Sequence, residues 1–178
     1  TFKYYDFFVS SFCSLFGLDS APYVLQLLLP VGISFYSFQA LSYSIDVYRG
    51  KISATKDIVA FFAYIAFFPQ LVAGPIERAT NLLPQFLQPR TFRYREAADG
   101  MRRILWGLFK KIVIADNCAW YVDIEWSDYA NQNGSTLMLA AFLFAIQIYC
   151  DFSGYSDIAI GTARLFGFSL RENFRIPY

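Results

Sequence analysis

A long apolar segment near the C-terminal end of the chain limits what the chain can fold into. The stretch "LMLAAFLFAIQI", at 137–148, is almost wholly apolar, and it belongs to a segment that runs from Thr136 to Phe168. A helix that crosses a bilayer needs about 20 apolar residues. This segment is longer, so we expect a membrane helix that tilts, bends or breaks, with Gly154 and Gly161 as natural places for a break.

The composition also indicates a membrane protein. Apolar residues make up 56% of the 178 residues, and charged residues make up 16%. A soluble domain of this length has too little interior to bury so much apolar surface, whereas a lipid-facing protein has no such limit. The net charge of +1 gives no sign of a nucleic-acid partner. The basic residues form short groups between apolar segments, as in cytoplasmic loops and interfacial anchors: Arg49, Lys51, Lys56; Arg90, Arg93, Arg95; Arg102, Arg103; Lys110, Lys111.

Several further segments have the composition of membrane helices. Residues 23–48 are long enough to span, with a kink expected at Pro30 and Gly32, and residues 2–18 fit either the tail of a membrane helix or an interfacial helix. Residues 58–73 are short for a span, are interrupted by Pro69, and have basic residues on both sides. A re-entrant hairpin and a short tilted span both fit this third segment, and the sequence leaves both open.

The polar stretch between these segments and the long helix is expected to lie at the membrane surface. Residues 77–95 are predicted to be a cytoplasmic loop, and residues 131–135 a second loop. Between them, Arg103 and Lys110 share one helical face, so this segment either lies in the interface or begins there and enters the membrane. The predicted fold class is therefore all-α: a polytopic helical membrane protein, with a re-entrant helix and an interfacial helix among its elements.

Few side chains in the sequence are suited to catalysis. The chain has no histidine and no CxxC motif, so we expect no metal site, and its three cysteines are widely spaced. Serine and tyrosine hydroxyls are numerous, but no histidine is present to activate them as nucleophiles.

Polar residues continue the long apolar helix on its C-terminal side. At helical spacing, Ser153, Asp157 and Arg164 share one face, and Asp151 and Tyr155 share a neighbouring face. Charges inside a bilayer are costly, so they face partners or water. Two hypotheses follow: a polar strip that lines a cavity for substrate, or an Asp157–Arg164 pair that locks helices together while Asp151 caps a break. The same two hypotheses apply to Gln70, Glu77 and Asn173.

Four stretches closely resemble the membrane-bound O-acyltransferase (MBOAT) family, above all its bacterial branch of alginate O-acetyltransferases and teichoic acid D-alanyl transfer proteins. They are "LPVGISFYSFQALSYSIDVYRGK" (29–51), "YIAFFPQLVAGPIERATNLLPQF" (64–86), "GLFKKIVIADNCA" (107–119) and "YCDFSGYSDIAIGTARLFGFSLRENFRIPY" (149–178).

The resemblance implies a multi-pass enzyme of the bacterial inner membrane with a central funnel. It implies transfer of an acyl group, acetyl by preference, from an intracellular thioester, either acetyl-CoA or an acyl carrier protein, toward an extracytoplasmic polysaccharide such as alginate. A partner acyltransferase outside the cytoplasm would complete the transfer. We expect residues 1–178 to form one membrane domain that continues past residue 178, where the family's catalytic histidine is expected. Seven residues are then candidates for the funnel lining: Gln70, Glu77, Asp151, Ser153, Tyr155, Asp157 and Asn173. The alternative is a non-enzymatic export or channel subunit.

The apolar composition leads to a first prediction. The protein should sediment with membranes, resist extraction at alkaline pH and stay dispersed only in detergent or lipid, because its apolar surface exceeds what a core of this size can bury. Fractionation followed by detergent-free size-exclusion chromatography checks this, and a stable monomer recovered from cytosol would contradict it.

Overall fold

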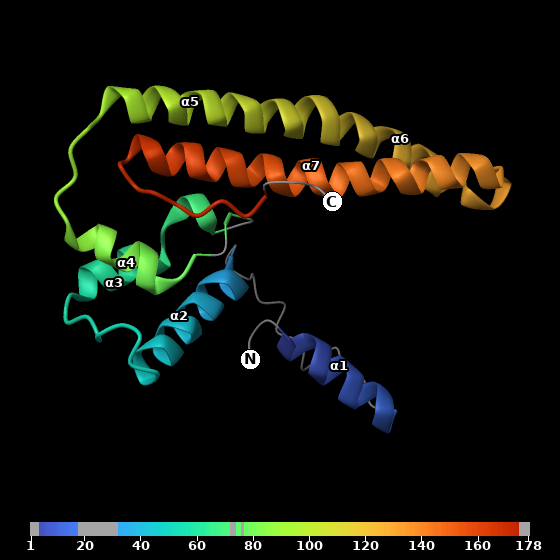
Figure 1. The fold of residues 1–178 in the computed structure, drawn as a ribbon. Coiled ribbons are helices and arrows are strands. Elements are labelled where there is room, and N and C mark those ends of the chain that lie inside the picture. The colour runs from blue at the N-terminus through green and yellow to red at the C-terminus, as the bar shows by residue number, and fades with distance from the viewer. Residues whose placement is uncertain (1–3, 18–31, 72–73, 76, 175–178) are drawn as a thin grey trace. The chain divides into compact units, whose positions relative to one another are not determined.

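A computed structural model describes residues 4–17, 32–71, 74–75 and 77–174. In these ranges all regular elements are helices, which agrees with the all-α prediction (Figure 1). The chain divides into two units, Thr1–Ser34 and Phe35–Tyr178. The first contains α1 (Tyr5–Phe16), an aromatic helix that ends at Gly17, whose φ of 65° is left-handed. This helix lies within the first predicted segment.

The long helix α7 (Gly134–Leu165) runs without interruption for 32 residues. It is about 48 Å long at 1.5 Å per residue. Among the described residues, α7 alone is long and apolar enough to cross a membrane. Of the three expected outcomes, tilt, bend or break, the structure rules out a break at Gly154 or Gly161. Both glycines are buried on the face of α7 that meets its neighbour, where the absence of a side chain serves close packing instead of bending.

The neighbour of α7 is a second long helical run that lies antiparallel to it (Figure 1). This run consists of α5 (Tyr94–Leu108), the π-helix η4 (Phe109–Ala115) and α6 (Asp116–Ser127). The sequence left two positions open for this segment, in the interface or entering the membrane from it. Neither alternative predicted that the segment packs along the long helix.

Two pairs of glycines set the distance between α5 and α7. A Cβ atom added to Gly161 would lie 2.5 Å from the carbonyl oxygen of Gly100, and one added to Gly107 would lie 2.6 Å from that of Gly154. Real Cβ atoms do not approach backbone oxygens so closely. The two backbones are therefore in direct contact at two levels, as at the small-residue interfaces of membrane helices.

Around the C-terminal end of α7 the chain forms an apolar core. It is built by α3 (Ile58–Ile65), the 3₁₀ turn η3 (Phe68–Gln70), α4 (Ala79–Leu87) and residues 168–170, with Tyr64, Leu82, Leu83 and Ile160 nearly inaccessible. The helix α2 (Ile33–Tyr48) joins this group where the Tyr43 hydroxyl accepts a hydrogen bond of 2.9 Å from the amide of Thr55.

Three local predictions can be compared with these helices. The expected loop at 77–95 instead contains α4, because burial of Ala79, Leu82 and Leu83 outweighs the proline inside the helix. The expected loop at 131–135 is shorter, since α7 already begins at Gly134. The third segment stops being α-helical at Ile65, before Pro69, as expected, and its re-entrant path stays a prediction. The kink expected at Pro30 lies outside the described residues, and Gly32, with a φ of 80°, directly precedes the start of α2 at Ile33.

The glycine contacts predict an asymmetric effect of alanine substitution. Gly161→Ala should lower the free energy of unfolding by about 1–3 kcal/mol, because the new methyl group overlaps a backbone oxygen that cannot move away. Gly134→Ala, whose Cβ would meet nothing within 4 Å, is the matched control and should change little. Thermal unfolding of both variants in detergent measures the difference, and equal stability would show that the helices do not touch there.

Candidate functional site

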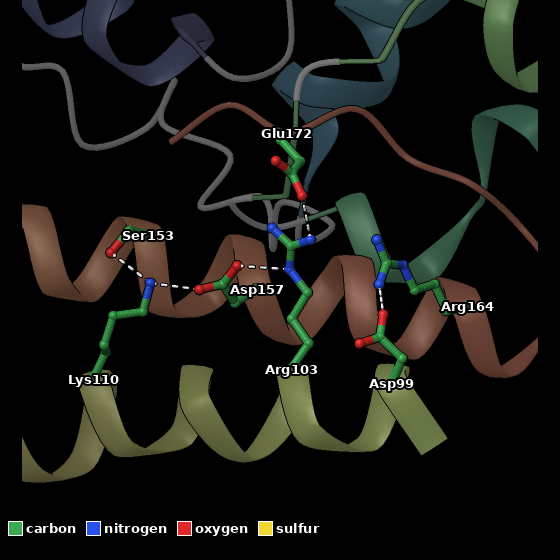
Figure 2. Close-up of polar contacts among 7 residues, drawn as sticks. All are labelled: Asp99, Arg103, Lys110, Ser153, Asp157, Arg164 and Glu172. Atoms are coloured by element: carbon green, nitrogen blue, oxygen red, sulfur yellow. Dashed lines mark hydrogen bonds and ion pairs between the residues drawn. The ribbon is translucent and has the colours of Figure 1, made fainter. Parts of the chain in front are cut away.

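The site is centred on Asp157, a carboxylate on the face of α7 that meets α5. Its Oδ1 accepts a hydrogen bond of 2.9 Å from Nε of Arg103, and its Oδ2 lies 2.5 Å from Nζ of Lys110 (Figure 2). The side chain of Asp157 is 14% exposed, and those of Arg103 and Lys110 are 19% and 12% exposed. The two cations offset the cost of placing this carboxylate where little water reaches it.

The partners of Asp157 come from the neighbouring helix and not from its own. Arg103 and Lys110 lie on one helical face, as the sequence predicted, and the antiparallel packing brings that face against α7. The predicted Asp157–Arg164 pair is wrong: Arg164 instead pairs with Asp99 of α5 (Figure 2). Seven positions along one helix separate residues by about 10 Å, whereas the glycine contacts bring the cations of α5 within hydrogen-bond distance.

Two further groups extend the network around Asp157. The Ser153 hydroxyl, buried on α7, accepts a hydrogen bond of 3.1 Å from Nζ of Lys110. Nη1 of Arg103 donates to Glu172 at 2.5 Å, which ties residues 168–174 to the helix pair (Figure 2). Burial by itself lowers the pKa of Arg103, but the hydrogen bonds and charges of Glu172 and Asp157 outweigh it, so that this pKa lies above its usual value.

Asp151 has a cation that the sequence did not predict. Nζ of Lys111 lies 2.6 Å from Asp151 and 2.9 Å from Asp116, and all three side chains are about half exposed. The hydrogen bonds that Lys111 donates to Asp151 and Asp116 raise the pKa of Lys111. Lys110 and Lys111 both belong to the π-helix, whose wider turn lets two consecutive lysines reach carboxylates at different levels of α7.

A groove of about 480 Å³ lies beside this network. The charged part of its lining consists of Arg103, Lys110 and Asp157. The remainder of its wall is apolar or aromatic: Trp106, Ile114, Tyr149, Cys150 and Phe174. Trp106 stacks on Phe109 with ring centroids 5.5 Å apart, which fixes one side of the wall. The groove can therefore hold a molecule with an extended apolar part and a polar or charged end.

The structure places the other predicted residues apart from the groove. Gln70 and Glu77 are buried in the apolar core around α3 and α4, where Gln70 donates to the Tyr64 carbonyl at 3.4 Å and Glu77 accepts from Asn81 at 2.9 Å. Glu77 also accepts a hydrogen bond from the amide of Arg171.

Tyr155 is half-buried on α7, and Asn173 is exposed on the C-terminal segment. The structure therefore brings Ser153 and Asp157 together at Lys110 and joins Asp151 to the neighbouring helix through Lys111. Tyr155 and Asn173 are not among the residues that line the groove. Within the described ranges, no cluster of His, Cys, Asp or Glu is suited to a metal ion.

The network includes residues that the sequence had not nominated for the site, namely Arg103, Lys110 and Glu172. The shared face of the two cations was visible in the sequence, but it was assigned to the membrane surface. Their acidic partner could not be identified, because it lies more than forty positions later in the chain.

Comparison with known proteins identifies relatives along the whole chain. Residues 22–178 match the model of the MBOAT, membrane-bound O-acyltransferase family. The chain is 44% identical over 183 residues to the "Probable alginate O-acetylase AlgI" of Pseudomonas putida, and the match covers 99% of the chain and 36% of that protein.

More distant relatives share the same region. The "Peptidoglycan O-acetyltransferase" of Helicobacter pylori is 34% identical, with 99% of the chain and 38% of that protein covered. The "Teichoic acid D-alanyltransferase" of Bacillus subtilis is 22% identical, with 83% of the chain and 38% of that protein covered. The chain thus spans little more than a third of the length of these relatives.

The two aspartates of α7 should differ in their contribution to stability. Asp157→Asn leaves Arg103 and Lys110 largely buried beside a neutral group and should cost on the order of 3 kcal/mol. Asp151→Asn breaks a half-exposed pair and should cost about 1 kcal/mol or less. Folded yield and thermal unfolding in detergent compare them, and equal losses would show that the network around Asp157 does not hold the helices together.

Proposed function

Because the chain belongs to the membrane-bound O-acyltransferase family, we propose that it is part of an enzyme that transfers an acetyl group toward an extracytoplasmic polysaccharide such as alginate. The observation that carries this proposal is the 44% identity to a protein named as an alginate O-acetylase, which extends over 99% of the chain. The peptidoglycan O-acetyltransferase relative supports the same acyl group on another cell-envelope polymer.

The proposed reaction needs a base that this chain does not provide. Attack of a hydroxyl on a thioester requires removal of the hydroxyl proton. The chain has no histidine, and Asp157, the carboxylate that lines the groove, is occupied in ion pairs with Arg103 and Lys110. A histidine in the part of the protein outside these 178 residues is therefore the proposed base. The helix pair described here is proposed to contribute the groove that holds the donor.

The groove supplies a role for the helix pair in that reaction. Its aromatic and aliphatic wall suits the acyl group and linker of a thioester, and its charged residues, Arg103, Lys110 and Asp157, suit the polar part of the donor. Arg103 is fixed between Asp157 and Glu172, so its guanidinium is held in place before substrate enters. A polar group that is fixed in advance can stabilise negative charge that develops during the reaction. Asp151, half-exposed at the edge of the network, is the proposed lining residue whose loss would affect turnover more than folding.

The remaining features of the enzyme are proposed by analogy with the family. We propose acetyl-CoA or an acyl carrier protein as the intracellular donor, an extracytoplasmic acyltransferase as partner, and a multi-pass location in the bacterial inner membrane. The channel or export alternative has no observation in its favour, since the relatives named here are transferases.

Acetyl transfer by the full-length protein is the direct test. In nanodiscs, it should release acetyl from radiolabelled acetyl-CoA or acetyl-carrier protein in a manner that depends on its partner and on alginate. The 178-residue chain alone should show none, because it lacks the base. Asp151→Asn in the full-length protein should reduce turnover at normal folded yield. Passage of polysaccharide without acetyl transfer would favour the export subunit.

A further inference from the structure

A second charged region lies where α7 ends and α5 begins, away from the network around Asp157 (Figure 1). The segment between α4 and α5 and the turn after α7 together form two adjoining hollows of about 190 and 120 Å³. Both hollows are lined by Arg90, Thr91, Arg93, Glu96 and Gly167, and the second also by Arg164. This cluster of arginines plays no part in the proposed reaction.

Arg90 is held in place with most of its hydrogen-bond donors unused. Its guanidinium lies 4.1 Å from the ring centroid of Phe168 and 5.7 Å from that of Phe86, and Nη1 donates to the Gln85 carbonyl at 3.1 Å. No carboxylate pairs with it in the part of the chain that the structure describes. A guanidinium has five N–H donors, so four remain to be satisfied beside an open hollow. A stacked arginine is pre-organised to bind a phosphate group.

The other two arginines of the hollows have weak or shared partners. Arg93 pairs with Glu96 at 2.9 Å, but these side chains are 68% and 51% exposed, so the pair adds little. Arg164 pairs with Asp99. Three arginines against two carboxylates leave an excess positive charge around the hollows, which favours an anionic ligand.

Exposed aromatic side chains flank the arginines. Phe92, Tyr94 and Phe166 are 75%, 81% and 55% exposed, although large apolar side chains on a water-facing loop gain nothing from such exposure. Aromatic residues beside cations are typical of the level at which lipid headgroups meet hydrocarbon. The length of α7, about 48 Å, is close to the 40–45 Å of a bilayer that includes its headgroups, so its end can lie at this level.

We propose that Arg90, Phe92, Arg93, Tyr94, Arg164 and Phe166 form an arginine–aromatic surface that binds the headgroup of an anionic phospholipid. The guanidinium of Arg90, fixed over Phe168, donates to the phosphate, and Arg93 adds charge. The exposed rings of Phe92 and Phe166 contact the first part of the acyl chains. The bound lipid would thereby fasten this end of the α5–α7 pair at the membrane surface.

Lipid binding to the full-length, delipidated protein tests this surface. Native mass spectrometry in detergent measures the affinity for phosphatidylglycerol and for phosphatidylcholine, and thermal unfolding measures the stabilisation that each lipid gives. The wild-type protein should prefer phosphatidylglycerol. The double variant Arg90→Gln/Arg93→Gln should bind it about tenfold more weakly, since charged hydrogen bonds are lost. The control Arg49→Gln/Lys51→Gln, which removes two exposed charges after α2, should keep the wild-type preference.

The readout separates lipid recognition from a purely structural role of Arg90. If Arg90 only packs on Phe168, the double variant unfolds earlier in both lipids, and the extra stabilisation by phosphatidylglycerol persists, which overturns the proposal. Arg90→Lys keeps the charge but loses the planar stacking, and should retain part of the preference. Equal losses in the control variant, or displacement of phosphatidylglycerol by 10 mM inorganic phosphate or by acetyl-CoA alone, would also overturn it.

Discussion

The close approach of α5 and α7 at their glycines is the contact on which the remainder of the site depends. Gly100 and Gly107 meet Gly161 and Gly154 backbone to backbone, so no side chain separates the helices there. This contact fixes the register of the antiparallel pair. It thereby brings Arg103 and Lys110, between and just beyond the two glycines of α5, to the level of Asp157. Larger residues at these positions would move the charges apart.

The register determined by the glycines also accounts for the low exposure of Asp157, Arg103 and Lys110. A carboxylate on an apolar helix is costly unless a partner of opposite charge is supplied. Asp157 receives two such partners and Asp151 one, while Glu172 and Ser153 accept hydrogen bonds from the cations. The polar part of α7 is thus paired by α5 and η4, and its apolar part packs on α6, where Trp126 meets Phe144 with ring centroids 4.8 Å apart. This arrangement allows one continuous helix to carry both.

Close packing and polar pairing together form the wall of the groove. Because Arg103 and Lys110 are fixed by Asp157, the charged part of the groove lining is already formed in the protein by itself. The π-helix contributes by widening one turn, so that Lys110 and Lys111 reach different carboxylates. The helix pair alone therefore fixes the charged residues that line the groove.

The sequence by itself determined the helical class, the membrane character, the family resemblance and the shared face of Arg103 and Lys110, because these depend on composition, motif and helical period. It could not determine which carboxylate those cations meet. Partner choice depends on the register between two helices, which is decided by glycine contacts distant in the chain. For the same reason, the sequence alone suggested Gly154 and Gly161 as places where the long helix breaks. Only the tertiary structure shows that they are places of contact, and that α4 forms because its apolar face is buried.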